Sequence, residues 1–573
     1  MKRILWKIGG EAGYGIMTTG TVLSKIASRL GYHVFDSVEY PSLIRGGHNT
    51  YDVFISDEEI HSLKHKIDYL ICLNKDTFEL HKDRLTSNTV VVYDPNEFDP
   101  GEGFQKIPVP FSEILKNHQG KIVMENMIAL GVSLALMGGD LTILNEIISE
   151  RFAKKGEAII EINHKFAAEG FKYVKDNHEK IIEPIFEKKD ADKKMVLTGN
   201  EAFALGSVIA DCRLYAAYPM TPATGVQTTL ASWQNKTGMI VRHSEDEIAA
   251  VLTAIGGSFA GVRSSTGTSG GGFALMVEAI SLAGITETPL VIFLSQRPGP
   301  ATGMPTWTEQ ADLLFAVNAG HGEFPKIVLA PGDVDEMLEL TAKAYNLADF
   351  YQTPIIVMSD MFLSESHKTI TQIFLNNLIN QYKINRGKLV VKPSDQKYLR
   401  YKETEDGISE RLIPGAKGYF YQANSYEHFE DGHTTEDSWV RINQVNKRKN
   451  KILNYLKADF PLPKIYGNFD KAETVFVAWG STKGPVLEAV ELLKEDKKQT
   501  ALIHFTHLYP LNEEKVRNLF SAKKNYVLVE NNSEGQFGKL LKQETGIDIE
   551  QKLLKYDGRT FWPEEIQKYV NNK

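Results

Sequence analysis

Cysteine is scarce in this chain, and its scarcity excludes several kinds of site. Only two of the 573 residues are cysteines, Cys72 and Cys212, and both stand in apolar stretches. A disulfide framework or a cysteine-ligated cluster needs more cysteines at close spacing. We therefore interpret both as buried structural thiols, since free cysteine is among the most buried residue types.

An excess of positive charge and a long apolar run are also missing. The formal net charge is −8 at pH 7, whereas a nucleic-acid-binding surface usually needs a basic patch. No apolar run approaches the roughly 20 residues of a membrane-spanning helix. Residues 1–6 lead directly into a strand pattern, so no secretory signal is expected. These observations predict a cytoplasmic protein that binds neither nucleic acid nor membrane.

Length and local patterns predict an α/β protein made of several domains. A chain of 573 residues is long enough for three or four domains. Continuous apolar strands, such as residues 69–73 and 89–93, are typical of parallel sheets covered on both faces. Three regions combine such strands with helical patterns, and a charged linker over 187–194 follows the first region. The expected α/β domains, with mainly parallel sheets, span 1–185, 195–370 and 466–573, and an irregular connecting segment spans 371–465.

A glycine-rich turn lies near the start of the first region. A strand over residues 4–8 is followed by glycines at 9, 10, 13 and 15 and by a helix over residues 16–30. Such a turn can present backbone N–H groups to a phosphate. The strict G-x-G-x-x-G spacing and a P-loop lysine are absent, so an ordinary structural turn is the alternative.

A stiff loop begins the functional motifs of the second region. Its sequence is Tyr218-Pro219-Met220-Thr221-Pro222-Ala223-Thr224. Each proline fixes its own φ and pushes the preceding residue toward extended geometry. The loop therefore holds two threonine hydroxyls in fixed positions, which suits the binding of a small anion. A structural turn without a ligand is the alternative.

Further motifs follow this loop in a fixed order. They are His243-Ser244-Glu245-Asp246-Glu247, an alanine- and glycine-rich helix over 248–261, Ser264-Ser265-Thr266-Gly267-Thr268-Ser269-Gly270-Gly271-Gly272-Phe273, a buried strand over 289–295, and Gln296-Arg297-Pro298-Gly299-Pro300. The ordered set resembles the α subunit of the 2-oxoacid:ferredoxin oxidoreductases, which are thiamine diphosphate enzymes. The resemblance covers nearly the whole chain.

The resemblance also extends to the two flanking regions. Residues 39–49, which include Arg45-Gly46-Gly47, resemble the γ subunit of the same family. The third region resembles the C-terminal domain of its α subunit. The chain thus looks like a γ–α fusion with a γ-type domain, a thiamine-pyrimidine-binding domain and a transketolase C-terminal-like domain. The implied reaction is oxidative decarboxylation of a 2-oxoacid with CoA to acyl-CoA and CO2, with electrons passing to ferredoxin.

The resemblance implies which acid contacts the thiamine pyrimidine. In the family a glutamate begins the glycine-rich helix, and the glycines at 256, 257 and 261 align it with Glu247. Glu245 is the second choice. The alternative is that the three consecutive acids only favour a helix N-terminus through the macrodipole. Tyr218 and Pro219 are further implied cofactor contacts.

Two residues are implied to hold the substrate carboxylate, namely Thr221 and Arg297. An arginine offers planar, bidentate recognition of a carboxylate. Arg297 follows a buried strand, and ligand sites lie at the carboxyl edge of parallel sheets. The alternative is an arginine paired with an acidic neighbour. Gly10, Gly13, Gly15 and Arg45 form a candidate loop for CoA or another phosphate.

The family's diphosphate motif is missing. Members of the family hold the metal through Gly-Asp-Gly, which does not occur in this sequence. We therefore expect no metal on this chain and half an active site. A separate β subunit would bring the diphosphate site, Mg²⁺ and an iron–sulfur cluster, in an α2β2 assembly. A non-catalytic scaffolding or regulatory subunit is the alternative from another functional class.

The substrate is expected to be 2-oxoglutarate, because the fusion with Glu405-Asp406-Gly407-Ile408 in its connecting segment most resembles α subunits assigned to that acid. Pyruvate and branched-chain 2-oxoacids stay open, as does the physiological direction of the reaction. Indolepyruvate:ferredoxin oxidoreductase fits less well, since its large subunit carries clustered cysteines.

Overall fold

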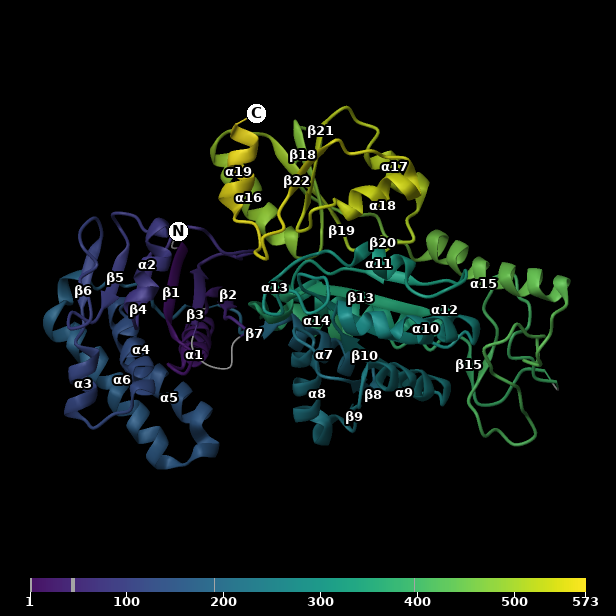
Figure 1. The fold of residues 1–573 in the computed structure, drawn as a ribbon, viewed down its shortest axis with the longest axis horizontal. Coiled ribbons are helices and arrows are strands. Elements are labelled where there is room, and N and C mark those ends of the chain that lie inside the picture. The colour runs from purple at the N-terminus through teal and green to yellow at the C-terminus, as the bar shows by residue number, and fades with distance from the viewer. Residues whose placement is uncertain (1–2, 43–46, 190, 396, 573) are drawn as a thin grey trace. The chain divides into compact units, whose positions relative to one another are not determined.

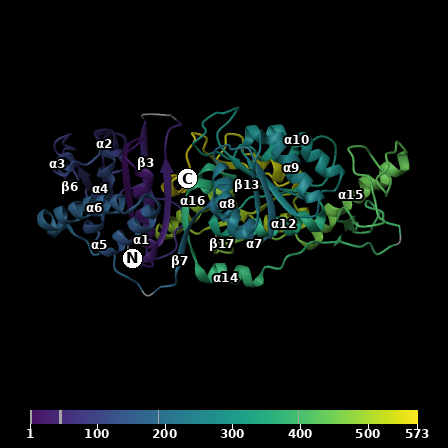
Figure 2. The same cartoon turned by 90° about the horizontal axis from the view of Figure 1, so that it is seen from below.

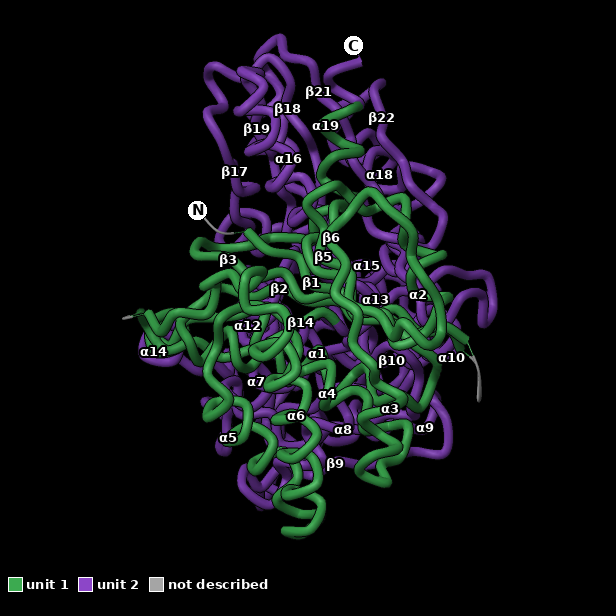
Figure 3. The backbone as a smooth tube through the Cα atoms, turned by 90° about the vertical axis from the view of Figure 1, so that its left-hand side faces the viewer, with its two compact units in different colours: residues 1–197, 366–377, 562–568 green, residues 198–365, 378–561, 569–573 purple. Residues whose placement is uncertain are grey.

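The computed structural model divides the chain into two units (Figure 3). Unit 1 comprises residues 1–197, 366–377 and 562–568, and unit 2 comprises residues 198–365, 378–561 and 569–573. The structure describes residues 3–42, 47–189, 191–395 and 397–572. Unit 1 is therefore completed by two short segments that come from far along the sequence.

An eight-stranded mixed sheet lies at the centre of unit 1, in the order β6-β5-β4-β1-β3-β2-β14-β7. The neighbours β4, β5 and β6 run parallel to β1, whereas β3 is antiparallel to both β1 and β2. The strands are β1 (Arg3–Glu11), β2 (His33–Glu39), β3 (His48–Ser56), β4 (Tyr69–Cys72), β5 (Val90–Tyr93), β6 (Gln105–Pro108), β7 (Lys194–Thr198) and β14 (His367–Thr371). The first strand is longer than the expected 4–8, so Gly9 and Gly10 belong to the sheet rather than to a turn.

Two closely packed helices cover part of this sheet (Figure 1). Every residue of α4 (Glu125–Leu136) is buried, as expected for a helix that is apolar all round. A Cβ at Gly131 would lie 1.9 Å from the carbonyl oxygen of Ala167, and one at Gly170 would lie 2.1 Å from that of Ile128. Glycine therefore lets α4 and α6 (Glu157–Asn177) approach backbone to backbone. The other unit 1 helices are α1 (Ile16–Arg29), α2 (Lys75–His81), α3 (Phe111–Asn117) and α5 (Leu141–Phe152).

A seven-stranded sheet forms the first layer of unit 2, in the order β20-β12-β13-β11-β10-β8-β9. All neighbouring pairs are parallel except β12 with β20. The strands are β8 (Cys212–Ala217), β9 (Ile240–His243), β10 (Arg263–Thr268), β11 (Leu290–Gln296), β12 (Ile327–Leu329), β13 (Pro354–Asp360) and β20 (His507–Tyr509). Continuous burial of β10, β11 and β13 follows from helices on both faces.

Helices cover the two faces of this sheet in pairs. Figure 2 shows α9 (Glu247–Phe259) and α10 (Gly270–Ile285) on one face, and α7 (Gly199–Ile209) and α12 (Val334–Tyr351) on the other. The helix α8 (Thr224–Thr237) packs on α7, and the short α11 (Leu313–Asn318) and α13 (Met361–Glu365) follow β11 and β13.

A second parallel sheet in unit 2 has the order β17-β19-β18-β21-β22, with β17 antiparallel at the edge. Its strands are β17 (Lys464–Gly467), β18 (Thr474–Trp479), β19 (Thr500–Phe505), β21 (Asn525–Glu530) and β22 (Gln551–Leu554). The accompanying helices are α16 (Lys483–Glu495), α17 (Glu513–Leu519) and α18 (Gln536–Thr545). Together the sheets confirm the expected α/β class.

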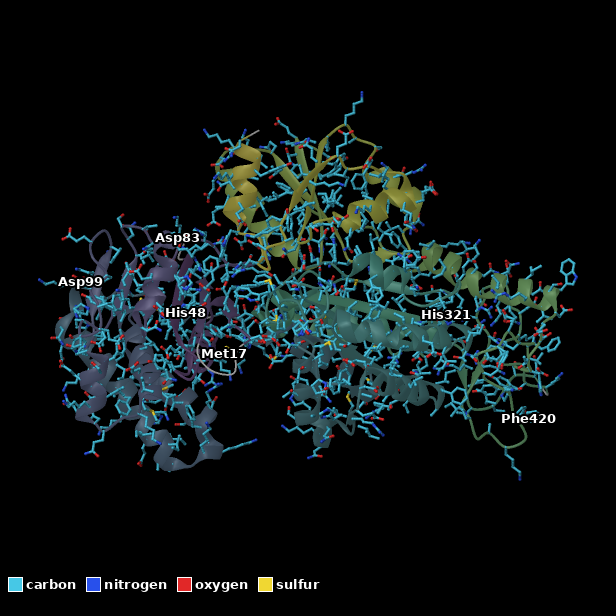
Figure 4. The ribbon with its side chains drawn as sticks, viewed as in Figure 1. Met17, His48, Asp83, Asp99, His321 and Phe420 are labelled. Atoms are coloured by element: carbon cyan, nitrogen blue, oxygen red, sulfur yellow. The ribbon has the colours of Figure 1, made fainter. Side chains whose placement is uncertain are left out.

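The segment expected to be irregular over 371–465 includes two helices, α14 (Gln372–Gln381) and α15 (Ser438–Ala458). Lys447 and Lys451, one turn apart in α15, bind the two oxygens of buried Glu287 at 2.6 and 2.5 Å. These ion pairs lower the pKa of Glu287 against the opposing effect of burial. The basic run 446–451 is thus partly a structural anchor, which its composition alone did not indicate. Elsewhere in the segment Phe420 is 82% exposed (Figure 4).

Both cysteines are free and buried, in β4 and β8, which confirms their interpretation as structural thiols. Burial raises the pKa of both thiols. Among the described residues, no helix combines the length and apolar character that a membrane crossing requires.

Candidate active site

The acidic run before α9 places one carboxylate inside the protein and two outside. Asp246 is the N-cap of α9 and accepts a hydrogen bond of 2.7 Å from the backbone N–H of Ala249. Glu247 is the first residue of the helix and is only 3% exposed, whereas Glu245 and Asp246 are exposed. N-capping therefore explains the presence of an acidic residue at position 246. It does not explain why the carboxylate of Glu247 is buried.

The buried carboxylate of Glu247 lies against the first turn of α10. A Cβ added at Gly272 would lie 2.4 Å from Glu247 Oε1 and 2.1 Å from Thr268 Oγ1. No described residue forms a hydrogen bond with Glu247 Oε1 or with the hydroxyl of Ser269, and both atoms are buried. Buried polar atoms nearly always have a hydrogen-bond partner. Two such atoms at one helix N-terminus indicate a place for a ligand.

The proline-flanked loop lies beside this point. The Thr221–Pro222 peptide bond is cis. Met220 Sδ accepts a hydrogen bond of 3.7 Å from Thr268 Oγ1. The Tyr218 ring is 40% exposed and meets the His243 ring edge-on, with 6.3 Å between centroids. The loop thus presents an aromatic face next to the segment that leads to Glu247.

Arg297 follows β11 directly and reaches the same loop. Its Nη1 donates a hydrogen bond of 2.7 Å to the backbone oxygen of Thr221. Burial lowers the pKa of Arg297, and the charge of Asp312 opposes this shift. Among the described residues no carboxylate lies within 4 Å of the Arg297 guanidinium, so the charge of Asp312 acts on it without a direct ion pair. The contact joins the two residues expected to hold a carboxylate.

Sheet topology brings these residues together. The strands β11, β10, β8 and β9 are consecutive neighbours and run parallel. Arg297 follows β11, Ser269 follows β10, the loop of Thr221 follows β8, and Glu247 comes four residues after β9. The carboxyl ends of parallel strands share one edge, where α/β proteins bind ligands. The arrangement can hold an anion and a hydrogen-bonding ring side by side.

Two carboxyl groups at this edge were missed by sequence reasoning. Asp312 Oδ2 would lie 2.6 Å from a Cβ at Gly270. Burial raises the pKa of Asp312 to about 6, although Arg297 lowers it. Burial and the charge of Asp312 raise the pKa of Glu309 to about 7. The one sequence feature that linked Glu309 and Asp312 to the site was their position shortly after Arg297. Nothing in the sequence indicated that the chain turns back to α10 at this point.

The glycine-rich turn of unit 1 has a different environment. Gly13 and Gly15 have φ of 104° and 76°, and Gly15 is the N-cap of α1. The nearby Glu125 is buried, and burial together with the charges of Glu97 and Asp94 raises its pKa to about 8. Carboxyl groups oppose a phosphate, so a cation would be needed. Arg45, the cation expected for this loop, lies outside the described residues.

His48 of β3 (Figure 4) and His81, the last residue of α2, form a histidine pair in unit 1. The Nε2 atoms of His48 and His81 are 3.2 Å apart. Burial and the charge of Lys7 lower the pKa of both, that of His48 to about 4. Neutral imidazoles can share one hydrogen bond, so the pair is a partly buried polar contact. No group of three or more metal-ligating side chains was found among the described residues.

Family models match the two regions in which these features lie. Residues 5–173 match the family described as pyruvate ferredoxin/flavodoxin oxidoreductase. Residues 206–447 match the description "pyruvate flavodoxin/ferredoxin oxidoreductase, thiamine diP-bdg". The second match includes every residue of the edge site between Tyr218 and Asp312.

Full-length relatives decide the family. The α subunit of 2-oxoacid:ferredoxin oxidoreductase from Sulfolobus sp is 32% identical over 99% of this chain and 96% of its own length. The chain belongs to the 2-oxoacid:ferredoxin oxidoreductase α subunits. The 2-oxoglutarate synthase subunit KorA of Methanocaldococcus jannaschii is 33% identical over 57% of this chain and 86% of its own length.

A solved structure agrees with this membership. The 2-oxoglutarate:ferredoxin oxidoreductase from Magnetococcus marinus, with 2-oxoglutarate, coenzyme A and succinyl-CoA bound, has a TM-score of 0.93 and 31% identity. The match covers 100% of this chain and 99% of that chain. The resemblance inferred from the motifs is thereby confirmed, and the protein is an α-type subunit of an oxidoreductase with a thiamine diphosphate-binding domain.

Proposed function

We propose that this α subunit forms the pyrimidine half of a thiamine diphosphate site in a complex that oxidises 2-oxoglutarate with CoA. The products would be succinyl-CoA and CO2, with electrons passing to ferredoxin. The observation that carries this proposal is the buried side chain of Glu247, whose Oε1 has no hydrogen-bond partner among the described residues.

The residues at the sheet edge fit the cofactor. Glu247 Oε1 and Ser269 Oγ are buried polar atoms that require a partner. Space is open beside Gly271, where a Cβ would meet nothing within 4 Å. Glu247 would hold a proton between its carboxyl group and a ring nitrogen of the pyrimidine, and Tyr218 and Pro219 would contact the cofactor. Thiamine diphosphate, when bound, supplies the nucleophilic carbon and the electron sink that decarboxylation of a 2-oxoacid needs.

Thr221 and Arg297 would bind the substrate carboxylate. Arg297 uses Nη1 for the Thr221 oxygen, and a guanidinium carries five N–H donors in a fixed fork. The contact with the stiff loop orients the remaining donors, which reduces the entropy lost when a carboxylate binds. The Thr221 hydroxyl adds a neutral donor to the same group.

The other half of the site would come from a β subunit. The Gly-Asp-Gly motif is absent from this sequence, so the diphosphate, Mg²⁺ and an iron–sulfur cluster are assigned to that partner. An α2β2 assembly in the cytoplasm follows as the simplest complex. The proposed domains are a γ-type domain over 1–185, a thiamine-pyrimidine-binding domain over 195–370, a connecting segment over 371–465 and a C-terminal domain over 466–573.

CoA is proposed to contact unit 1. The candidate loop consists of Gly10, Gly13, Gly15 and Arg45. The charges of Glu125 and Glu97 act on Tyr14 of this loop, so Arg45 would have to supply the positive charge.

A substrate panel tests the proposed reaction. The purified complex of this chain with its β subunit is assayed for CoA-dependent ferredoxin reduction with 2-oxoglutarate, pyruvate and branched-chain 2-oxoacids. The highest kcat/KM is expected with 2-oxoglutarate. A higher kcat/KM with pyruvate or a branched-chain 2-oxoacid would assign that acid as the substrate. The proposed site residues would stay the same.

A second measurement addresses a non-catalytic scaffolding role. Thiamine diphosphate is titrated into the β subunit with and without this chain. Tighter binding in the presence of this chain is expected, because Glu247 and Tyr218 would add contacts. Equal affinity in both titrations would favour the scaffold.

A further inference from the structure

The chain between Arg297 and α11 returns to the edge site, and one buried glutamine fixes its path. Gln310 is fully buried. Its backbone N–H donates to the Asn531 oxygen at 2.7 Å, and its Nε2 donates to the Trp479 oxygen at 2.8 Å. Its Oε1 accepts from the Asn531 N–H at 3.0 Å, and its backbone oxygen accepts from Asn532 Nδ2 at 3.0 Å. All four polar positions of Gln310 are therefore bound, three to the segment that follows β21 and one to the last residue of β18.

A second glutamine fixes the residue two positions further on. The backbone N–H of Asp312 donates a hydrogen bond of 2.9 Å to Oε1 of Gln296, which is buried and directly precedes Arg297. Gln296 Nε2 donates to the Ser359 oxygen at 3.0 Å. The backbone of Asp312 is thus tied to the strand end that carries Arg297.

The carboxylate of Asp312 has one oppositely charged group acting on it, the guanidinium of Arg297. No described residue forms a hydrogen bond with this carboxylate, and one side of it lies against Gly270 at the start of α10. Glu309 on the same segment carries the same sign of charge. Glu247 lies across Gly272, and Gln536 of α18, which accepts from the Leu314 N–H, is neutral.

We propose that Asp312 is a positioning residue that acts through Arg297 and limits how tightly the 2-oxoacid carboxylate is held. The ionised Asp312 attracts the guanidinium and repels an incoming carboxylate, so both compete for one positive charge. This inference rests on the proposed function, because it takes Arg297 as the substrate-binding residue.

The proposal makes a signed prediction for pH. Burial places the pKa of Asp312 at about 6, so the group is mostly neutral below that pH and charged above it. Arg297 stays charged throughout, since a guanidinium is not deprotonated in proteins. The KM for the 2-oxoacid should therefore rise between pH 5.5 and 7.5, on the order of threefold to tenfold for two partly buried charges.

The test measures KM and kcat of the intact complex over this pH range in the unmodified protein and in Asp312→Asn. The variant should keep the low KM at every pH, with little change in kcat. Glu309→Gln is the matched control, since it removes a neighbouring carboxyl group but should leave the rise in KM. If Asp312→Asn fails to assemble, Asp312→Ser is measured in its place.

Two results separate the inference from the proposed function. If the KM of Asp312→Asn still rises with pH, the proposed role of Asp312 is overturned. A KM of this variant that lies above that of the unmodified protein at every pH would overturn it as well. Arg297→Lys is measured alongside. If that variant leaves KM unchanged, the substrate-binding role of Arg297 fails; if it raises KM while Asp312→Asn changes nothing, only the inference about Asp312 fails.

Discussion

The carboxylate of Glu247 and the backbone of Gly272 are packed so closely that no side chain fits between them. A Cβ at position 272 would come within 2.4 Å of Oε1 and 2.7 Å of Cγ of Glu247. Real Cβ atoms do not approach other atoms so closely, so any substitution at 272 must move the carboxylate. Glycine at this position therefore fixes where the acid lies.

We expect Gly272→Ala to disable the complex while the chain still folds. A displacement of about 1 Å at a catalytic group can lower turnover about 10²-fold. Thiamine diphosphate affinity should fall as well, because Glu247 contacts it. Gly256→Ala is the matched control: it is an exposed residue of α9, the helix that Glu247 begins, and its Cβ would meet nothing within 4 Å. Equal activity of the two variants would show that the position of Glu247 is not critical.

The isolated chain should have no activity. Two cysteines do not suffice for an iron–sulfur cluster, and the diphosphate motif is absent. The purified chain should be colourless and should reduce no dye with a 2-oxoacid and CoA. The complex with the β subunit should be coloured and should reduce the dye. Turnover by the isolated chain would contradict the division of the active site between two subunits.

Replacement of Arg297 or Thr221 should change substrate use more than cofactor binding. Arg297→Lys keeps the charge but loses the planar fork, and its KM for the 2-oxoacid should rise roughly 10-fold or more. Thr221→Val removes a neutral donor, so the rise should be smaller, roughly threefold. Cofactor affinity, followed by fluorescence quenching, should stay constant. Weakened cofactor binding at an unchanged KM would move both residues to the cofactor site.

A buried acid supports the sheet of unit 2 through three arginines. Asp349 binds Arg263, Arg386 and Arg411 at 2.8, 2.6 and 2.7 Å. Asp349→Asn leaves these guanidinium groups without a countercharge, which should cost about 3–5 kcal/mol of stability. Thermal or urea unfolding measures the loss. Asp395→Asn is the control, because its ion pair with Lys402 is half exposed and should contribute less than about 1 kcal/mol.

Much of the site could be predicted from the sequence, because several motifs directly follow an apolar strand and therefore show where that strand ends. Arg297 and the loop of Thr221 follow apolar strands, and parallel neighbours bring such ends to one edge. The assignment of Glu247 rather than Glu245 depends on which acid turns inward, which the run of three acids does not reveal. The buried side chain of Glu247 and the exposed one of Glu245 favour the assignment made from the motif alignment.

Other features could not be predicted because they depend on contacts distant in sequence. Asp312 reaches the site through the hydrogen bonds of Gln310 and Gln296, whose partners lie up to 222 residues away. The charged run in α15 reads as a solvated segment until buried Glu287 is seen between Lys447 and Lys451. Likewise, β1 continues through Gly9 and Gly10 because it pairs with β3.

The central claim is that Glu247 is the acid of the thiamine site, and Glu247→Gln tests it most directly. An amide cannot exchange a proton with the pyrimidine nitrogen, so the complex should assemble normally and lose roughly 10²–10⁴-fold in turnover. Glu245→Gln, two residues earlier and exposed, should keep nearly full activity. Full activity of Glu247→Gln, above all together with an inactive Glu245→Gln, would contradict the account.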